Sequence, residues 1–205
     1  MKRLLFISIF FLYYFDVSSQ IVIGPGAGIY YRPYTLRGIA NSIEKKELDY
    51  YLGIMGEVKL MSKIYAHSHL AYIFRQSTEA ASEIHTHLPD FKSGLFTNKE
   101  MYINLDVLYS VIKTSKIGLG LGILHKLDSE VQENYFNKNT VLSHFSPASI
   151  YNMSVVITNN WGRLGLSARY FYQFKSENLD SNHFRILDDR SGFTLGFNYK
   201  LFGYK

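Results

Sequence analysis

The feature that most restricts the fold of this sequence is a period-two alternation between apolar residues and small or polar residues. Successive side chains of a β-strand point to opposite faces, so this period predicts strands, whereas amphipathic helices repeat every ~3.6 residues. No segment keeps the helical period over several turns. The sequence therefore predicts an all-β protein with eight strands, in residues 21–32, 48–60, 64–76, 101–112, 117–124, 151–157, 164–174 and 193–201.

The connections between these strands alternate in length. Up-and-down barrels of the outer membrane have tight periplasmic turns and long external loops, and strands of about ten residues can cross a bilayer at a tilt. Short turns are expected near 61–63, 114–116 and 159–162, and long polar loops at 33–47, 77–99, 128–147 and 175–191.

The two faces of the strands differ in chemistry. One face is apolar along nearly every strand, while the other carries glycine, asparagine, serine and charged residues. A membrane barrel turns its apolar face to lipid, whereas a sandwich or a soluble barrel buries it. We predict an eight-stranded antiparallel up-and-down transmembrane β-barrel, with a soluble barrel or a sandwich as the alternative.

Aromatic residues favour the membrane barrel, because they cluster near the ends of the apolar face. Two aromatic levels are typical of the interfaces of a bilayer. The predicted aromatic girdle has an upper level of Tyr31, Tyr50, Tyr72, Phe74, Tyr151, Tyr172, Phe174 and Phe193, and a lower level of Tyr109, Trp161 and Tyr199.

The opposite face predicts a polar interior. Eight strands enclose a lumen that side chains can fill, and buried charges require partners. Inward glycines would make room for large residues such as Tyr51, Tyr65 and Phe171. The predicted lumen network contains Arg32, Asp49, Glu57, Lys59, His67, His69, Arg75, Asp106, Arg169 and Lys200.

The first residues have the organisation of a secretory signal peptide. Met1–Arg3 is basic and Leu4–Phe15 is apolar, and small residues then lead to a cleavage site after Ser19. The apolar run is too short to span a bilayer as a helix. We therefore expect a signal peptide at residues 1–19 and an outer-membrane barrel domain at residues 20–205.

Composition excludes several classes of function. The 205 residues include no cysteine, and the net charge of +5 comes from scattered basic residues. Disulfides, thiolate metal sites and a basic nucleic-acid-binding stripe are therefore not expected. The glycine-rich segments 24–28 and 118–122 precede no helical pattern, so they do not predict a phosphate loop, and no cofactor is expected.

Two kinds of motif could carry chemistry. Alternate histidines share a face of a strand, so each of the His-x-His pairs at 67–69 and 85–87 could supply two metal ligands, but no third ligand is identifiable and we predict no metal site. His144 and Ser146 are similar to the catalytic pair of outer-membrane lipid A deacylases, in which histidine activates the hydroxyl. Pro147 departs from that pattern, and the pair is an alternative rather than the main prediction.

Three segments carry a family resemblance. They are LGIMGEVKLMSKIYAHSHLAYIFRQ (52–76), MYINLDVLYSVIKTSKIGLGLGILHKL (101–127) and GFTLGFNYKLF (192–202). Together they resemble the Bacteroidetes-type outer-membrane β-barrel family that includes the PorT-like proteins. The resemblance implies an outer-membrane location and a non-enzymatic role.

The sequence thus predicts an outer-membrane barrel with a filled lumen and a structural or binding role through its long loops. The expected partners are outer-membrane lipid, the barrel-assembly machinery during biogenesis and an envelope protein. The alternatives are a lipid-modifying hydrolase and a narrow channel.

Overall fold

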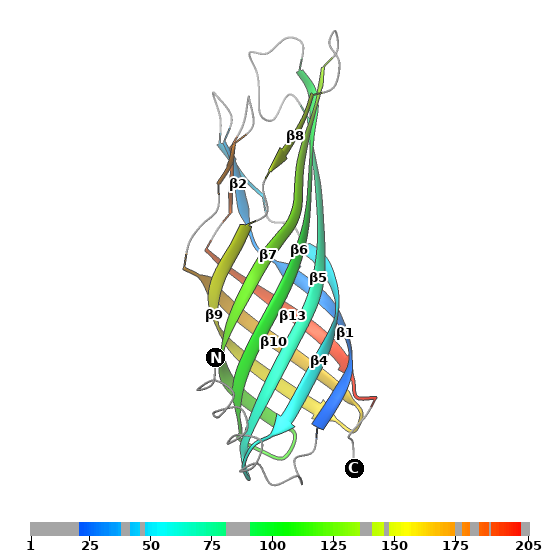
Figure 1. Cartoon of the computed structure of the whole chain (residues 1–205), viewed down its shortest axis with the longest axis vertical. Helices are drawn as coiled ribbons and strands as arrows, with labels where there is room; N and C mark the ends of the chain where they lie inside the picture. The colour runs from blue at the N-terminus through cyan, green and yellow to red at the C-terminus, as the bar shows by residue number, and fades with distance from the viewer. Residues whose placement is uncertain are drawn as a thin grey trace, which may run out of the picture.

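Eight long antiparallel strands form a tilted ring (Figure 1). The computed structural model describes residues 21–37, 42–45, 48–80, 91–135, 141–145, 148–174, 178–180, 185–188 and 190–201. The predicted signal peptide lies outside these residues. The barrel strands are β1 (Ile21–Tyr31), β4 (Leu48–Lys59), β5 (Ile64–Ala80), β6 (Phe91–Ser110), β7 (Ser115–Tyr135), β9 (Ala148–Trp161), β10 (Leu164–Gln173) and β13 (Ser191–Tyr199).

Each of these strands pairs with two neighbours, so the ring is closed. The hydrogen-bonded order runs β6-β5-β4-β1-β13-β10-β9-β7, and β7 pairs with β6. The first and last strands of the ring meet in the register Ala27↔Phe197. The predicted eight-stranded antiparallel up-and-down barrel is confirmed. The described residues include no helix that is long and apolar enough to cross a membrane.

The apolar face of the strands points outward and is exposed. Leu52, Leu119 and Leu121 are 70%, 69% and 66% exposed. The charged and amide side chains on the opposite face are buried inside the ring, among them Asp106, Asn152 and Arg169. The sandwich alternative is wrong, because a sandwich would bury the apolar faces against each other.

Three barrel strands continue beyond the ring as a projecting sheet (Figure 1). The β5–β6 pairing runs as far as Ala80↔Ser93, and β7 reaches Tyr135 beside β6. The short strand β8 (Val141–Phe145) pairs with this upper part of β7. Much of the sequence predicted as loops at 77–99 and 128–147 is therefore strand. The expectation of loops was wrong because polar residues on a solvated sheet do not show an apolar period.

The ladder between β6 and β7 contains a β-bulge where the sheet leaves the barrel. Lys99 pairs with Asp128 and Glu100 pairs with Lys126, so Leu127 is the extra residue of β7. A bulge bends its strand and increases the local twist.

A second, small sheet lies at the same upper end. Its strands follow the order β11 (Asn178–Asp180), β12 (Arg185–Asp188), β2 (Tyr34–Arg37) and β3 (Ser42–Lys45). Strands therefore also occur within the loops predicted at 33–47 and 175–191. Tyr34 is fully buried, with its ring 6.4 Å from that of Phe96 and 5.4 Å from the guanidinium of Arg75.

At the opposite end, the described connections between strands are short turns close to the predicted positions. They join β4 to β5 at 60–63, β6 to β7 at 111–114 and β9 to β10 at 162–163. Gly162 adopts a φ of 60°, which favours glycine in the tightest of these turns. Lys116 was expected in a turn, but it lies inside β7.

Glycines in the ladder make room for large inward side chains. A Cβ built on Gly196 would lie 1.7 Å from the hydroxyl oxygen of Tyr51, and one on Gly192 would lie 2.5 Å from Phe171. Both rings are buried. These contacts support the expected role of inward glycines for Tyr51 and Phe171, whereas the half-buried Tyr65 has no such contact among the described glycines.

The fit of Tyr51 against Gly196 predicts a stability difference between two glycine positions. Gly196→Ala should lower the free energy of unfolding by about 1–3 kcal/mol, because overpacking displaces a buried ring. Gly26→Ala is the matched control, because its Cβ would have no neighbour closer than 3.5 Å. Urea unfolding in detergent, followed by the fluorescence of Trp161, measures both. Equal losses would show that Tyr51 does not depend on the space at Gly196.

Candidate functional site

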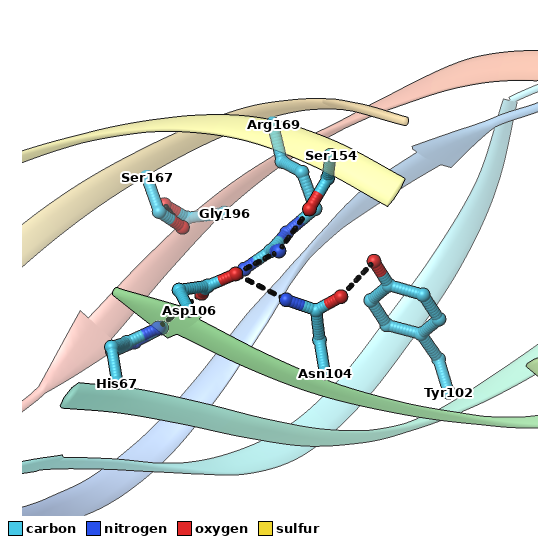
Figure 2. Close-up of polar contacts among 8 residues, drawn as sticks. All are labelled: His67, Tyr102, Asn104, Asp106, Ser154, Ser167, Arg169 and Gly196. Carbon is cyan, nitrogen blue, oxygen red and sulfur yellow. Dashed lines mark hydrogen bonds and ion pairs between the residues drawn. The ribbon is translucent and has the colours of Figure 1, made fainter. Parts of the chain in front are cut away.

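The most connected polar group in the described lumen is centred on the carboxylate of Asp106. Asp106 accepts hydrogen bonds from both terminal nitrogens of Arg169 at 2.6 Å, from His67 Nδ1 at 2.8 Å and from the amide of Asn104 (Figure 2). Arg169 also donates to Ser154 Oγ at 2.9 Å. We call these five residues the Asp106 cluster.

Four strands contribute to the Asp106 cluster, and a glycine leaves the space for it. His67 comes from β5, Asp106 from β6 and Arg169 from β10. The partner of Asp106 on β7 is Gly120, where a Cβ would lie 1.9 Å from Asp106 Oδ1. The glycine-rich segment of β7 therefore accommodates the ion pair. The hydroxyl of the cluster, Ser154 Oγ, lies beside the guanidinium of Arg169. Because arginine stays protonated in a protein, Arg169 cannot act as a base that activates this hydroxyl.

An aromatic layer lies directly above the Asp106 cluster. Tyr102 donates to Asn104 Oδ1 at 3.1 Å, which joins the two layers. The ring of Phe171 stacks on Tyr30 with centroids 5.3 Å apart, and Tyr102 lies 6.4 Å from both. Tyr51 packs edge-on against His69 at 5.2 Å. These rings form one buried cluster with apolar residues of β5, β7 and β9, namely Ala71, Ile73, Leu124 and Ile150.

Ion pairs fill the lumen above the aromatic layer. Arg75 Nε donates to Asp49 Oδ2 at 2.8 Å, and Arg32 donates to Glu100 Oε1 at 2.7 Å. Asn98 also donates to Glu100. All five side chains are buried, so each charge is stabilised by a partner of opposite sign rather than by water.

A third charged group lies at the lower end. Lys116 Nζ donates to Glu57 Oε1 at 2.5 Å and lies 3.7 Å from the ring centroid of Tyr65. Lys200 is buried at the same end. Lys59 was predicted to belong to the lumen network, but it is not buried in the lumen. It alternates onto the inward side, but it is the last residue of β4 and its side chain is exposed at the end of the barrel.

Little space remains between these layers. The cavity bordered by His67, His69, Arg169 and Asn198 has a volume of about 10 Å³. Such a volume holds about one water molecule. At this cavity, side chains of the Asp106 cluster and its neighbours leave room for no more than that.

The structure brings most of the predicted lumen residues together. Asp49, Glu57, Arg75, Asp106 and Arg169 make ion pairs inside the ring. Sequence reasoning missed several buried polar residues just outside the assigned strand ends, namely Asn98, Glu100, Lys116, Lys126 and Glu133. Extending the period by a few residues in β6 and β7 would have placed the first four of them inward, but not Glu133, because the bulge at Leu127 changes which positions of β7 face the lumen.

The structure describes only some of the residues that were considered for metal binding and catalysis. His67 bonds to Asp106, and His69 packs against Tyr51 and Tyr102. In the part of the chain that the structure describes, no three histidine or acidic side chains group as metal ligands. His85, His87 and Ser146 lie outside the described residues. His144 is in β8, where only the backbone is described.

The predicted aromatic girdle lies on the outer surface. Ten of its members are exposed there: Tyr50, Tyr72, Phe74, Tyr109, Tyr151, Trp161, Tyr172, Phe174, Phe193 and Tyr199. Tyr31 is partly buried, because its ring stacks on Phe193 with centroids 4.9 Å apart. Tyr170 and Phe197 are further exposed outward aromatics that the prediction did not include.

Comparison with known proteins finds similarity in fold alone. No family profile and no curated protein sequence matches the chain. Ail, the attachment invasion locus protein of Yersinia pestis, was solved with the heparin analogue sucrose octasulfate. It is 11% identical with a TM-score of 0.46, and the match covers 87% of this chain and 99% of Ail.

Two further solved structures show similar relationships. The neisserial surface protein NspA is 9% identical with a TM-score of 0.47, over 90% of this chain and 99% of NspA. The toluene transporter TodX of Pseudomonas putida is 6% identical with a TM-score of 0.28, over 87% of this chain and 68% of TodX. The resemblance to PorT-like proteins stays an expectation.

The Asp106 cluster predicts a large cost for removing its central charge. Asp106→Asn should lower the free energy of unfolding by about 3–5 kcal/mol, because it leaves the buried Arg169 without a counter-charge. Asp128→Asn is the control, since Asp128 pairs with Lys99 at 3.1 Å on the exposed surface. Its loss should cost about 0–1 kcal/mol. Similar midpoints for both variants in guanidinium unfolding would contradict a stabilising role for the cluster.

Proposed function

We propose that this protein is an outer-membrane β-barrel whose filled lumen makes it a rigid support for a binding surface on the projecting sheet. The observation that carries the membrane assignment is the combination of an exposed apolar exterior with a buried, ion-paired interior. This arrangement is the reverse of that of a water-soluble barrel and the one that lipid requires. Closure of the ring supports it, because a hydrocarbon environment excludes unpaired strand edges.

The outer surface also has the features of two bilayer interfaces. Above the apolar belt, Lys99 and Asp128 form an outward ion pair at 3.1 Å. Exposed aromatic residues lie just below this level and again at the lower end, where Tyr109 and Trp161 are 50% and 55% exposed. Aromatic side chains prefer such interfaces because they have both apolar and polar parts.

A binding role fits the interior better than conduction does. The aromatic layer and the Asp106 cluster occupy the lumen, and the cavity beside them has a volume of only about 10 Å³. A channel would require a continuous wet path. Beyond the apolar belt, the upper parts of β5, β6 and β7 form a sheet together with β8. A binding role gives this sheet a function, whereas conduction does not.

The projecting sheet has a strand edge that can accept another chain. The last pair between β4 and β5 is Tyr50↔Phe74, whereas the β5–β6 pairing continues to Ala80. Above Phe74, the second edge of β5 pairs with no strand in the described part of the chain. A free edge offers backbone hydrogen bonds to an extended segment of a partner. An envelope protein that adds a strand here is the partner that we propose.

The membrane assignment predicts a charge penalty that depends on depth. Leu121→Arg should lower the free energy of unfolding by about 2–4 kcal/mol in lipid, because Leu121 faces outward in the middle of the belt. Thr97→Arg, outward but above the ion pair of Lys99, should cost about 0–1 kcal/mol. Unfolding titrations of both variants in phospholipid vesicles measure the difference. An unchanged stability for Leu121→Arg would remove the lipid-facing assignment.

The binding role predicts contacts at the free edge of β5 in living cells. A photo-crosslinking residue at Thr78 should give a discrete protein adduct, because an added strand would lie about 5 Å away. The same residue at Leu105, an exposed position of the apolar belt, is the control and should give no protein adduct. Gel shifts after irradiation provide the measurement. Adducts from Leu105 but not from Thr78 would place the interaction on the belt and contradict a role for the sheet.

A further inference from the structure

The short-turn end of the barrel carries exposed positive charge on each turn. Lys63 lies in the β4–β5 turn, Lys113 in the β6–β7 turn and Arg163 in the β9–β10 turn. Lys59, at the end of β4, is a further exposed cation among the described residues of this end. We call these four residues and their turns the short-turn rim.

No exposed carboxylate lies in the described turns and strand ends that carry Lys59, Lys63 and Lys113. Segments 53–66, 105–120 and 155–167 contain only two acidic residues, Glu57 and Asp106. Both are buried and hold Lys116 and Arg169 inside the lumen. The exposed charges of the described β4–β5 and β6–β7 turns are therefore all positive.

The same turns expose large apolar side chains beside the cations. Lys113 directly follows Val111 and Ile112 in the sequence. Arg163 lies between Trp161 and Leu164. Lys63 extends toward the ring of Tyr109, with its Nζ 5.8 Å from the ring centroid. Each of the following apolar residues of the rim is more than half exposed: Met61, Val111, Ile112, Trp161 and Leu164.

We propose that the short-turn rim binds the anionic headgroups of phospholipids in the adjoining leaflet, an inference that rests on the proposed membrane location. The apolar side chains would enter the acyl region, while the lysine and arginine side chains reach the phosphates at the surface. A soluble polyanion would satisfy the cations but leave the apolar side chains in water. The combination of the two on every turn therefore fits a lipid surface.

The charge also distinguishes between kinds of lipid. A zwitterionic headgroup presents no net charge to four cations, whereas phosphatidylglycerol presents one negative charge. Each basic residue near an anionic surface favours association by about fivefold at ordinary ionic strength, and salt weakens the effect. The rim should therefore enrich phosphatidylglycerol over phosphatidylcholine in its first lipid shell.

The only tryptophan of the chain provides a local probe for this enrichment. Trp161 lies in the rim beside Arg163 and is exposed. The folded protein is placed in phosphatidylcholine vesicles in which a minor fraction of lipid is brominated phosphatidylglycerol, or the same fraction of brominated phosphatidylcholine. Bromine quenches tryptophan only at short range. We expect several-fold stronger quenching by the brominated phosphatidylglycerol, with the difference reduced at high salt.

Two charge-neutralising variants assign the preference to the rim. The triple variant Lys63→Gln, Lys113→Gln and Arg163→Gln should be quenched equally by the two brominated lipids. The control variant, Lys99→Gln with Arg190→Gln, removes exposed cations at the other end and should keep the preference. Heat-modifiable migration on gels verifies that both variants are folded. If the triple variant does not fold, the salt dependence of the wild-type preference provides the same test.

The outcomes separate this inference from the proposed function. Equal quenching of the wild-type protein by both lipids would overturn headgroup binding and leave the membrane location standing. A preference that survives in the folded triple variant, or that is insensitive to salt, would also overturn it. Absence of quenching by either lipid would place Trp161 outside the bilayer and overturn the membrane location together with the inference.

Discussion

Closure of the ring between β1 and β13 is the constraint on which the rest of the structure depends. It gives every barrel strand two hydrogen-bonded neighbours and divides the side chains into an enclosed set and an exposed set. Because the side-chain period of a strand is two, a register shift of one residue would exchange these sets and place charges such as Asp106 outside. Ring closure and the register of each strand together therefore fix the environment of every side chain of the barrel.

The enclosed set is arranged in layers that depend on differences in side-chain size. Charged groups lie above and below an aromatic layer, and glycines such as Gly120 and Gly196 provide the space for their largest neighbours. Three of the described ion pairs join residues that are far apart in the sequence: Arg32 with Glu100, Glu57 with Lys116, and Asp106 with Arg169 across 63 positions. Interior packing and ring closure therefore stabilise each other.

The sequence predicts the barrel well because alternation is a local property, and the faces of Leu121 and Asp106 follow from it directly. It predicts the partners inside the lumen poorly, because strand tilt and stagger decide which inward side chains meet. Glu100 and Lys116 were missed for a different reason. Both lie just outside the apolar part of their strands, where the period is no longer visible. The projecting sheet was missed for the same reason, since both of its faces carry polar residues.

The bulge at Leu127 lies where the projecting sheet is connected to the barrel. β6 and β7 continue from the barrel into the sheet without a loop, and the extra residue of β7 lies directly after Lys126, the last residue that pairs with β9 of the ring. Asn98 and Ser129, bonded at 2.7 Å beside the bulge, join the two strands at this bend. A molecule captured by the sheet would consequently be held at a set distance and angle from the barrel, and a lateral force on it would act on the barrel at the bulge.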